Sequence, residues 1–150
     1  MSDAPSSLRE VASGSLPPIS GRNTVLVLED NETLAGLVTV ILTQIGLKVV
    51  WTRFGRDGLE KFNQLVDEVV LVLADCHLPD MHGGDVCKQV HVLAPNVPVL
   101  LTSGRVSPET LAALPISALT KFLPKPYSPA EMQAKVQAML SLASGAASAA

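Results

Sequence analysis

The stretch VVLVLADCHLPDMHGGD, residues 69–85, is the most informative part of this chain because it shows where a buried strand ends. It begins with a continuous run of aliphatic residues, which is typical of a strand buried on both faces. The run stops at a carboxylate, Asp75, and a proline and two glycines follow at Pro79, Gly83 and Gly84. An acid at this position is either a turn-forming residue or part of a chemical site. The rest of the sequence has to distinguish the two.

Strand-like and helix-like segments alternate on both sides of this stretch. Short apolar runs predict five strands, at 24–30, 47–52, 69–75, 97–103 and 121–123. Apolar residues at helical spacing predict three helices between them, at 34–45, 55–66 and 84–93. Gly46 is placed to end the first of these helices.

Two further helices are marked by their first residues. Ser107 and Pro108 pair a capping serine with proline at the first helical position, and Ser128 and Pro129 do the same near the C-terminus. Glu131 completes a capping box in the second case. Because Pro115 interrupts the pattern that begins at Pro108, we expect that helix to be short or irregular.

Five strand and helix repeats predict an α/β protein with a parallel sheet covered by helices on both faces. Right-handed crossovers make such a sheet doubly wound, and its sites lie at the carboxyl ends of the strands. We expect this domain over residues 23–142. The Ser-, Pro- and Gly-containing residues 1–22 are expected to form a flexible leader, and residues 143–150 a flexible tail.

The composition limits the classes of function. Of the 150 residues 47% are hydrophobic and 17% charged, which fits a globular domain with an aliphatic core. The formal net charge of −3 gives no electrostatic reason to expect direct nucleic-acid binding. The sequence lacks an apolar run of the ~20 residues that span a bilayer and lacks a secretory signal. Cys76 and Cys87 have no metal-site spacing, so we expect free thiols, no membrane contact and a cytoplasmic location.

Chemically active side chains occur where the predicted strands end. Glu29 and Asp30 end the first strand, Asp75 ends the third, and Lys125 follows the fifth. These ends meet at one edge of a parallel sheet, so three carboxylates and an ammonium group should converge there. Clustered carboxylates suit a hard ion, most simply Mg²⁺. Asp75 could then attack a phosphoryl group, with Lys125 stabilising the charge on its oxygens.

This arrangement resembles the response-regulator receiver domain of two-component signalling. Four motifs match in the family's order and span residues 24 to about 142: LEDN, ADCHLPDMHGG, LLTSG and FLPKPY. They are most similar to receivers of hybrid sensor histidine kinases and of single-domain regulators. The resemblance implies a flavodoxin-like sheet of five parallel strands in the order 2-1-3-4-5.

The resemblance also implies a role for each acid. Asp75 would be the phosphorylated aspartate and a metal ligand. Asp30 would bind Mg²⁺ directly, and Glu29, which replaces an aspartate usual in the family, would bind it through water. The backbone carbonyl of His77 would complete the protein's ligands.

The remaining roles belong to the later strands. Lys125 would contact the phosphoryl group, with a cis bond to Pro126. Ser103 would be the switch hydroxyl, with Thr102 as its rival, because neighbours on a strand face opposite ways and only one can reach the site. Phe122 would be the aromatic residue that changes rotamer with it. Receivers usually have a continuous helix where Pro115 stands, so the shape of the fourth helix is left open.

The implied function is Mg²⁺-dependent transfer of a phosphoryl group from a phosphohistidine donor to Asp75, which switches a protein-interaction face. Such a chain would catalyse weak self-phosphorylation and autodephosphorylation and no metabolic reaction. Its partners would be a histidine kinase or histidine-phosphotransfer protein and a downstream protein target. It would be a monomer or a weak, phosphorylation-dependent dimer without an output domain of its own. A stand-alone regulator and an excised receiver of a hybrid kinase both remain open.

Three alternatives use the same fold. An aspartyl-phosphate phosphohydrolase is disfavoured, because such enzymes place a second acid where this chain has His77. A flavin or nucleotide module would want a Gly-rich phosphate loop after the first strand, and LEDNETL is acidic instead. A pseudo-receiver that only binds partners is the third alternative, and the complete set of site residues argues against it.

Overall fold

Five parallel strands form the central sheet of the computed structural model, which describes residues 22–105 and 107–149. They are β1 (Thr24–Leu28), β2 (Lys48–Thr52), β3 (Val69–Asp75), β4 (Val99–Ser103) and β5 (Thr120–Pro124). Their order across the sheet is β2-β1-β3-β4-β5, with every neighbouring pair parallel. The predicted strand order and sheet type are therefore confirmed.

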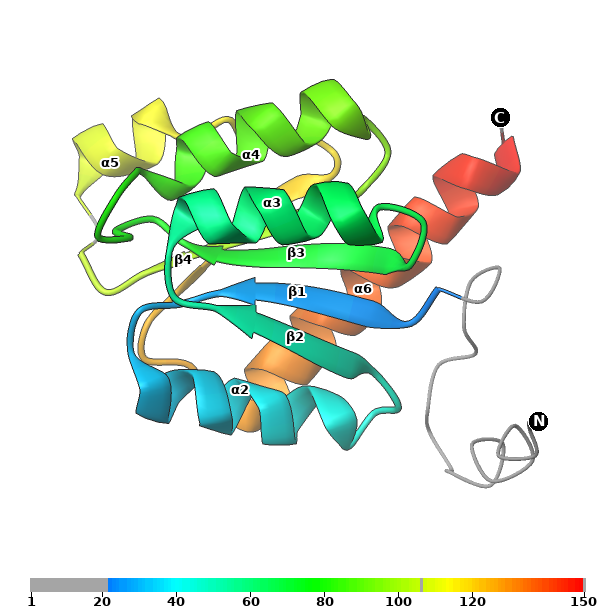
Figure 1. Ribbon diagram of the computed structural model, residues 1–150, viewed down its shortest axis with the longest axis horizontal. Coiled ribbons are helices and arrows are strands. Elements are labelled where there is room, and N and C mark those ends of the chain that lie inside the picture. The colour runs from blue at the N-terminus through cyan, green and yellow to red at the C-terminus, as the bar shows by residue number, and fades with distance from the viewer. Residues whose placement is uncertain (1–21, 106, 150) are drawn as a thin grey trace.

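Helices cover both faces of the sheet (Figure 1). They are α2 (Glu32–Thr43), α3 (Gly55–Leu65), α4 (Gly83–Leu93), α5 (Pro108–Ala113) and α6 (Pro129–Ala149). Figure 1 shows α2 and α6 on one side of the sheet and α3, α4 and α5 on the other. The carboxyl ends of the strands all point to the same edge, as a doubly wound sheet requires.

The core consists of two aliphatic layers, one on each face of the sheet. Val27, Leu73 and Leu100 pack in the layer that α2 and α6 cover, together with Val38 and Met132. In the opposite layer Leu26, Val72 and Leu101 pack against Phe62 of α3 and Val86 of α4. Every residue of β1, β3 and β4 is buried, which explains why these strands read as continuous apolar runs.

Local sequence signals set most of the element ends. Gly46 follows α2 with a φ of 88°, a left-handed conformation that glycine adopts at little cost. The Ser128 hydroxyl accepts the Glu131 N–H at 3.0 Å, and the Glu131 carboxylate accepts the Ser128 N–H at 2.8 Å. The predicted capping box at the start of α6 is therefore confirmed. β4 begins after Pro98, which has no N–H to donate to the sheet.

Two segments near the C-terminus differ in regularity. The helix expected to be short is the 6-residue α5, and Pro115 lies in the irregular connection between it and β5. By contrast, α6 runs as far as Ala149, past the domain end expected at residue 142 and into the expected tail. The alanine-rich sequence there favours helix over other conformations.

The expected leader lies almost wholly outside the described residues. None of the helices in the described part is both long enough and apolar enough to cross a membrane.

Candidate functional site

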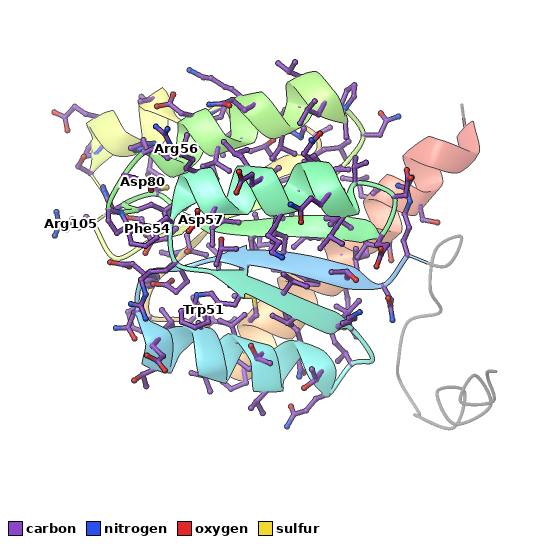
Figure 2. The ribbon with its side chains drawn as sticks, in the orientation of Figure 1. Trp51, Phe54, Arg56, Asp57, Asp80 and Arg105 are labelled. Atoms are coloured by element: carbon purple, nitrogen blue, oxygen red, sulfur yellow. The ribbon has the colours of Figure 1, made fainter. Side chains whose placement is uncertain are left out.

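The carboxyl edge of the sheet brings together the three acids that the sequence singled out. Glu29 follows β1 directly, Asp30 is the next residue, and Asp75 is the last residue of β3. Glu29, Asp30 and Asp75 can each offer a carboxylate oxygen such that all three oxygens lie within 4.8 Å of one another. Glu29 and Asp75 are buried, whereas Asp30 is partly exposed. Figure 2 shows Phe54, Asp80 and Arg105 at this same edge, where the strand arrows end.

Lys125, directly after β5, is the counter-ion of this cluster. Its Nζ donates to Asp75 Oδ2 at 2.8 Å and to Glu29 Oε1 at 3.1 Å. Burial lowers the pKa of Lys125, but its contacts with Asp75 and Glu29 outweigh that effect, so the net pKa is raised. Burial raises the pKa of Glu29, although the bonds from Asn31 and Lys125 oppose it. The peptide bond between Lys125 and Pro126 is cis, as the resemblance to receiver domains implied.

The loop after β3 holds the Asp75 side chain in place. The His77 N–H donates to Asp75 Oδ1 at 2.9 Å, so both carboxylate oxygens of Asp75 have partners. The loop then returns to the strand, where the Gly83 N–H donates to the Cys76 carbonyl at 3.0 Å. A Cβ on Gly83 would lie 2.5 Å from the Asp75 carbonyl oxygen, so this close return requires glycine.

The surroundings of the site are apolar. Cys76, next to Asp75, is fully buried, and burial raises its pKa to about 11. Burial also raises the pKa of Tyr127 to about 12. A cavity of about 380 Å³ opens beside Lys125 and is lined by Leu34, Gly104, Lys125, Pro126 and Tyr127. Both cysteines are free, as expected.

The two candidate switch hydroxyls lie at the end of β4. Both Thr102 and Ser103 are buried. The Ser103 hydroxyl accepts the N–H of Arg105 at 2.9 Å, and the Ser103 carbonyl accepts the N–H of Lys125 at 2.9 Å. Within the described residues no hydrogen bond joins either hydroxyl to Asp75. Phe122 of β5 is half-buried against the core layer beneath α3 and α4.

Several residues that shape the site were not among the sequence candidates. The Asn31 N–H donates to Glu29 Oε2 at 3.1 Å, while the Asn31 side chain caps α2. Asp80 accepts the N–H groups of Gly55 and Arg56, at 2.8 and 2.9 Å, and so ties the loop after β3 to the start of α3. The cap at Asn31 is readable from its position before a helix. The partners of Asp80 lie more than twenty residues away, and the local sequence carries no signal for them.

The donor set fits a hard divalent cation. Three carboxylates can bring oxygens within 4.8 Å of one another, two of them contact the Lys125 ammonium group, and oxygen-only ligation is what Mg²⁺ prefers. Burial of the Glu29 carboxyl keeps its pKa raised even though Asn31 and Lys125 donate hydrogen bonds to it. A further cation would stabilise the charged form of these acids.

The chain is a doubly wound parallel α/β domain with an acid cluster and a lysine at the carboxyl edge of its sheet, and comparison with known proteins identifies its family. The family model described as the response regulator receiver domain matches residues 25–137. The chain therefore belongs to the response regulator receiver domain family.

Individual relatives agree with this assignment. The transcriptional regulatory protein CreB of Escherichia coli is 34% identical over 120 residues, which are 79% of this chain and 51% of CreB. The sensor kinase CckA of Brucella abortus is 29% identical over 138 residues, 92% of this chain and 15% of CckA. The chain thus spans about half the length of the first relative and a small part of the second.

A solved structure shows the same fold. The signal receiver domain of an HD domain-containing protein from Pseudomonas fluorescens matches with a TM-score of 0.77. The match covers 89% of this chain and 97% of that domain at 19% sequence identity, so it is a likeness of fold alone.

Proposed function

We propose that this chain is a phosphoacceptor of a two-component or phosphorelay system and that Asp75 accepts a phosphoryl group from a phosphohistidine donor in the presence of Mg²⁺. The observation that carries the proposal is the contact of Lys125 with Asp75 and Glu29, at 2.8 and 3.1 Å, inside a cluster of three carboxylates. Such a cluster joins a nucleophile to the positive charge that phosphoryl transfer needs.

The chemistry follows from these positions. A carboxylate oxygen of Asp75 forms a bond to phosphorus while the phosphorus–nitrogen bond of the donor breaks, and the donor's imidazole leaves. The His77 N–H and Lys125 orient the Asp75 carboxylate. Lys125 would also contact the oxygens of the incoming phosphoryl group. Asp30, Asp75 and the His77 carbonyl would hold Mg²⁺, with Glu29 acting through water. A bound Mg²⁺ would neutralise charge on the acids and on the transferring oxygens.

We further propose Ser103 as the switch hydroxyl and Phe122 as the aromatic residue that follows it. A phosphoryl group on Asp75 offers new acceptor oxygens close to β4, and a local charge change of this kind can bias a two-state element. Ser103 would exchange the bond that its hydroxyl donates to the Arg105 carbonyl, at 3.2 Å, for a bond donated to a phosphoryl oxygen. The face made by α5, β5 and α6 would then change and recruit a downstream protein.

Thr102 remains the rival of Ser103, and substitution separates the two. Ser103→Ala should leave phosphorylation of Asp75 intact. It should abolish the change in the amide NMR signals of α5 and β5 that phosphorylation causes. Thr102→Val should retain that change. The opposite pattern would assign the role to Thr102.

The donor protein is proposed to dock on α2. This helix exposes Leu37 and Val40, and Glu32 is its one charged residue. The apolar cavity beside Leu34 and Lys125 lies where α2 meets the site. Val40→Glu should slow transfer from a phosphohistidine protein and leave labelling by acetyl phosphate unchanged. An equal loss with both donors would argue against docking on this helix.

Intact mass spectrometry tests the phosphoacceptor proposal. Incubation with acetyl phosphate and Mg²⁺ should add one phosphoryl group to the wild-type chain and none to Asp75→Asn. Excess chelator should abolish the adduct because the metal is removed. Asp57→Asn, an exposed acid on α3, is the matched control and should be labelled like the wild type. An adduct that persists in Asp75→Asn would contradict the proposal, and no adduct on any variant would favour a pseudo-receiver.

We also propose that the receiver domain spans residues 23–142, a range that contains the family match at 25–137. Two free, buried cysteines are compatible with a reducing cytoplasm. Light scattering of the labelled and unlabelled chain would test whether it stays a monomer or forms a weak dimer.

A further inference from the structure

Two side chains from the end of β2 donate hydrogen bonds to the backbone of the acidic pair. Trp51 Nε1 donates to the Glu29 carbonyl at 2.7 Å. Arg53 Nη1 donates to the Asp30 carbonyl, also at 2.7 Å. Figure 2 shows Trp51 beside β2. The two bonds fall on consecutive residues that also carry the carboxylates of the candidate metal site.

These two carbonyls lie just beyond the point where the backbone hydrogen bonds between β1 and β2 end. The last ladder-like bond between β1 and β2 joins the Glu29 N–H to the Thr52 carbonyl, at 3.1 Å. The chain then turns into α2, which begins at Glu32. Trp51 supplies a partner for the Glu29 carbonyl in a part-buried bond, and Arg53 supplies one for the Asp30 carbonyl in an exposed bond. The loop therefore stays attached to β2 for two further residues.

The two donors are themselves held in place. The Arg53 guanidinium lies 5.3 Å from the centre of the Trp51 ring, within the range of a cation–π contact. It also pairs with Glu32 of α2 at 3.4 Å. On the other side of the loop, the Asn31 N–H bonds to the Glu29 carboxylate. The acidic pair is therefore attached both to β2 and to α2.

We propose that Trp51 and Arg53 are positioning residues for metal binding and that they hold the Glu29–Asp30 backbone where both carboxylates face Asp75. The inference rests on the proposed function, because it requires the acids to bind a divalent cation. Neither side chain touches the ion or the phosphoryl group. They act through the carbonyls of the residues that do, as outer partners of a metal site commonly act.

Trp51→Phe tests the role because it keeps an aromatic ring and removes the N–H donor. We expect Mg²⁺ affinity, measured by isothermal titration calorimetry, to fall about tenfold, the lower end of the effect of losing an outer partner. The Mg²⁺ concentration for half-maximal labelling by acetyl phosphate should rise by the same factor, with the maximal rate within twofold of wild type. Arg53→Lys keeps the positive charge but removes the planar guanidinium that lies over the Trp51 ring. It should also lower the affinity for Mg²⁺, by a smaller factor.

Two controls separate the possible results. Gln64→Ala changes a side chain that lines the same 280 Å³ cavity as Trp51 and Arg53 and should bind Mg²⁺ like the wild type. Asp30→Asn removes a proposed ligand and should lose binding. If Asp30→Asn loses binding but Trp51→Phe stays within threefold of wild type, the positioning role is wrong and the proposed function stands. If the maximal rate falls while Mg²⁺ affinity does not, the role of Trp51 is structural only. If the wild type binds no Mg²⁺, both proposals fail.

Discussion

The site edge of the sheet and the connection from α5 to β5 are held together in different ways. At the site, Lys125 joins Glu29 and Asp75, which lie 96 and 50 residues earlier in the chain. In the connection most backbone bonds are local, from Ile116 to Leu114 and, in both directions, between Ser117 and Thr120, and one longer bond joins the Val99 N–H to the Leu119 carbonyl. Long-range side-chain bonds join three strand ends at the site, whereas the local bonds of the connection fix a turn.

The side chains of the two regions also differ in how far they are buried. Leu101, on β4, has an exposed fraction of 0%, while Leu111 of α5 and Ile116 after it are 41% and 49% exposed. Segments with few buried apolar side chains open more readily than core strands. The residues proposed for chemistry therefore lie in a firmly packed part of the fold. The proposed output face includes Leu111, which is more exposed.

The largest expected difference is in the free energy of unfolding that is lost when either of two leucines is replaced by alanine. Leu101→Ala should lower the free energy of unfolding by about 2–5 kcal/mol, as expected for a fully buried leucine. Leu111→Ala should change it by about 0.5 kcal/mol or less, because the side chain is already partly in water. Urea unfolding of both variants measures the difference. Similar costs at the two positions would mean that α5 is packed as firmly as the sheet.

Removing the counter-ion of the site should have the next largest effect. Lys125→Met leaves Glu29 and Asp75 buried without their shared ammonium group. In chelator at pH 7 we expect a loss of about 2 kcal/mol in the free energy of unfolding. This is below the usual cost of breaking a buried pair, since the Lys125 side chain is 20% exposed. Lys121→Met, on β5, is the matched control and should cost less, and equal losses would show that the ion pairs add little.

A smaller effect is expected where the site loop is tied to α3. The Asp80 carboxylate accepts the N–H groups of Gly55 and Arg56, and these bonds hold its pKa below the usual value. Asp80→Asn replaces this carboxylate with a neutral amide. The loss should be about 1 kcal/mol, typical of a helix cap. Thermal unfolding against Asp57→Asn, an exposed acid of the same helix start, provides the comparison. If the two variants unfold alike, the tie between the loop and α3 is not stabilising.

The smallest expected effect is a dependence on alkaline pH. The pKa of Lys125 is raised above its ordinary value of 10.5, so its contribution to stability is complete below that pH and is lost as pH rises through the raised value. The difference in the free energy of unfolding between the wild type and Lys125→Met should therefore become only partly smaller between pH 8 and 11. A Tyr127→Phe background is required, because the raised pKa of Tyr127 gives a change of the same sign. A gap that widens with pH would contradict the ion-pair assignment.

The sequence predicted those features that depend on local pattern. The third strand was predicted with its observed ends because residues 69–75 are apolar up to Asp75 and buried on both faces. The convergence of Glu29, Asp75 and Lys125 followed from one rule, that parallel strands end at the same edge. The predicted fourth strand begins two residues before the observed one because Val97 and Pro98 are also apolar and buried. Hydrophobicity alone does not show where sheet bonding begins.

Contacts between side chains and distant backbone were not predictable in this way. Trp51, Arg53 and Asp80 each reach a partner more than twenty residues away, and each contact depends on a rotamer and on a loop position that the fold sets. The alanine-rich residues after 142 also read as a tail, although their helix propensity is high and α6 continues through them. Composition suggested flexibility there, and local propensity favoured the helix.

Locating the phosphoryl group within the chain tests the central claim most directly. After labelling with acetyl phosphate and Mg²⁺, reduction with borohydride converts an aspartyl phosphate to homoserine, which peptide mass spectrometry then locates. We expect homoserine at Asp75 alone, with neighbouring Asp80 and Asp85 unchanged. Homoserine at another acid, with Asp75 left intact, would contradict the assignment of the phosphoacceptor.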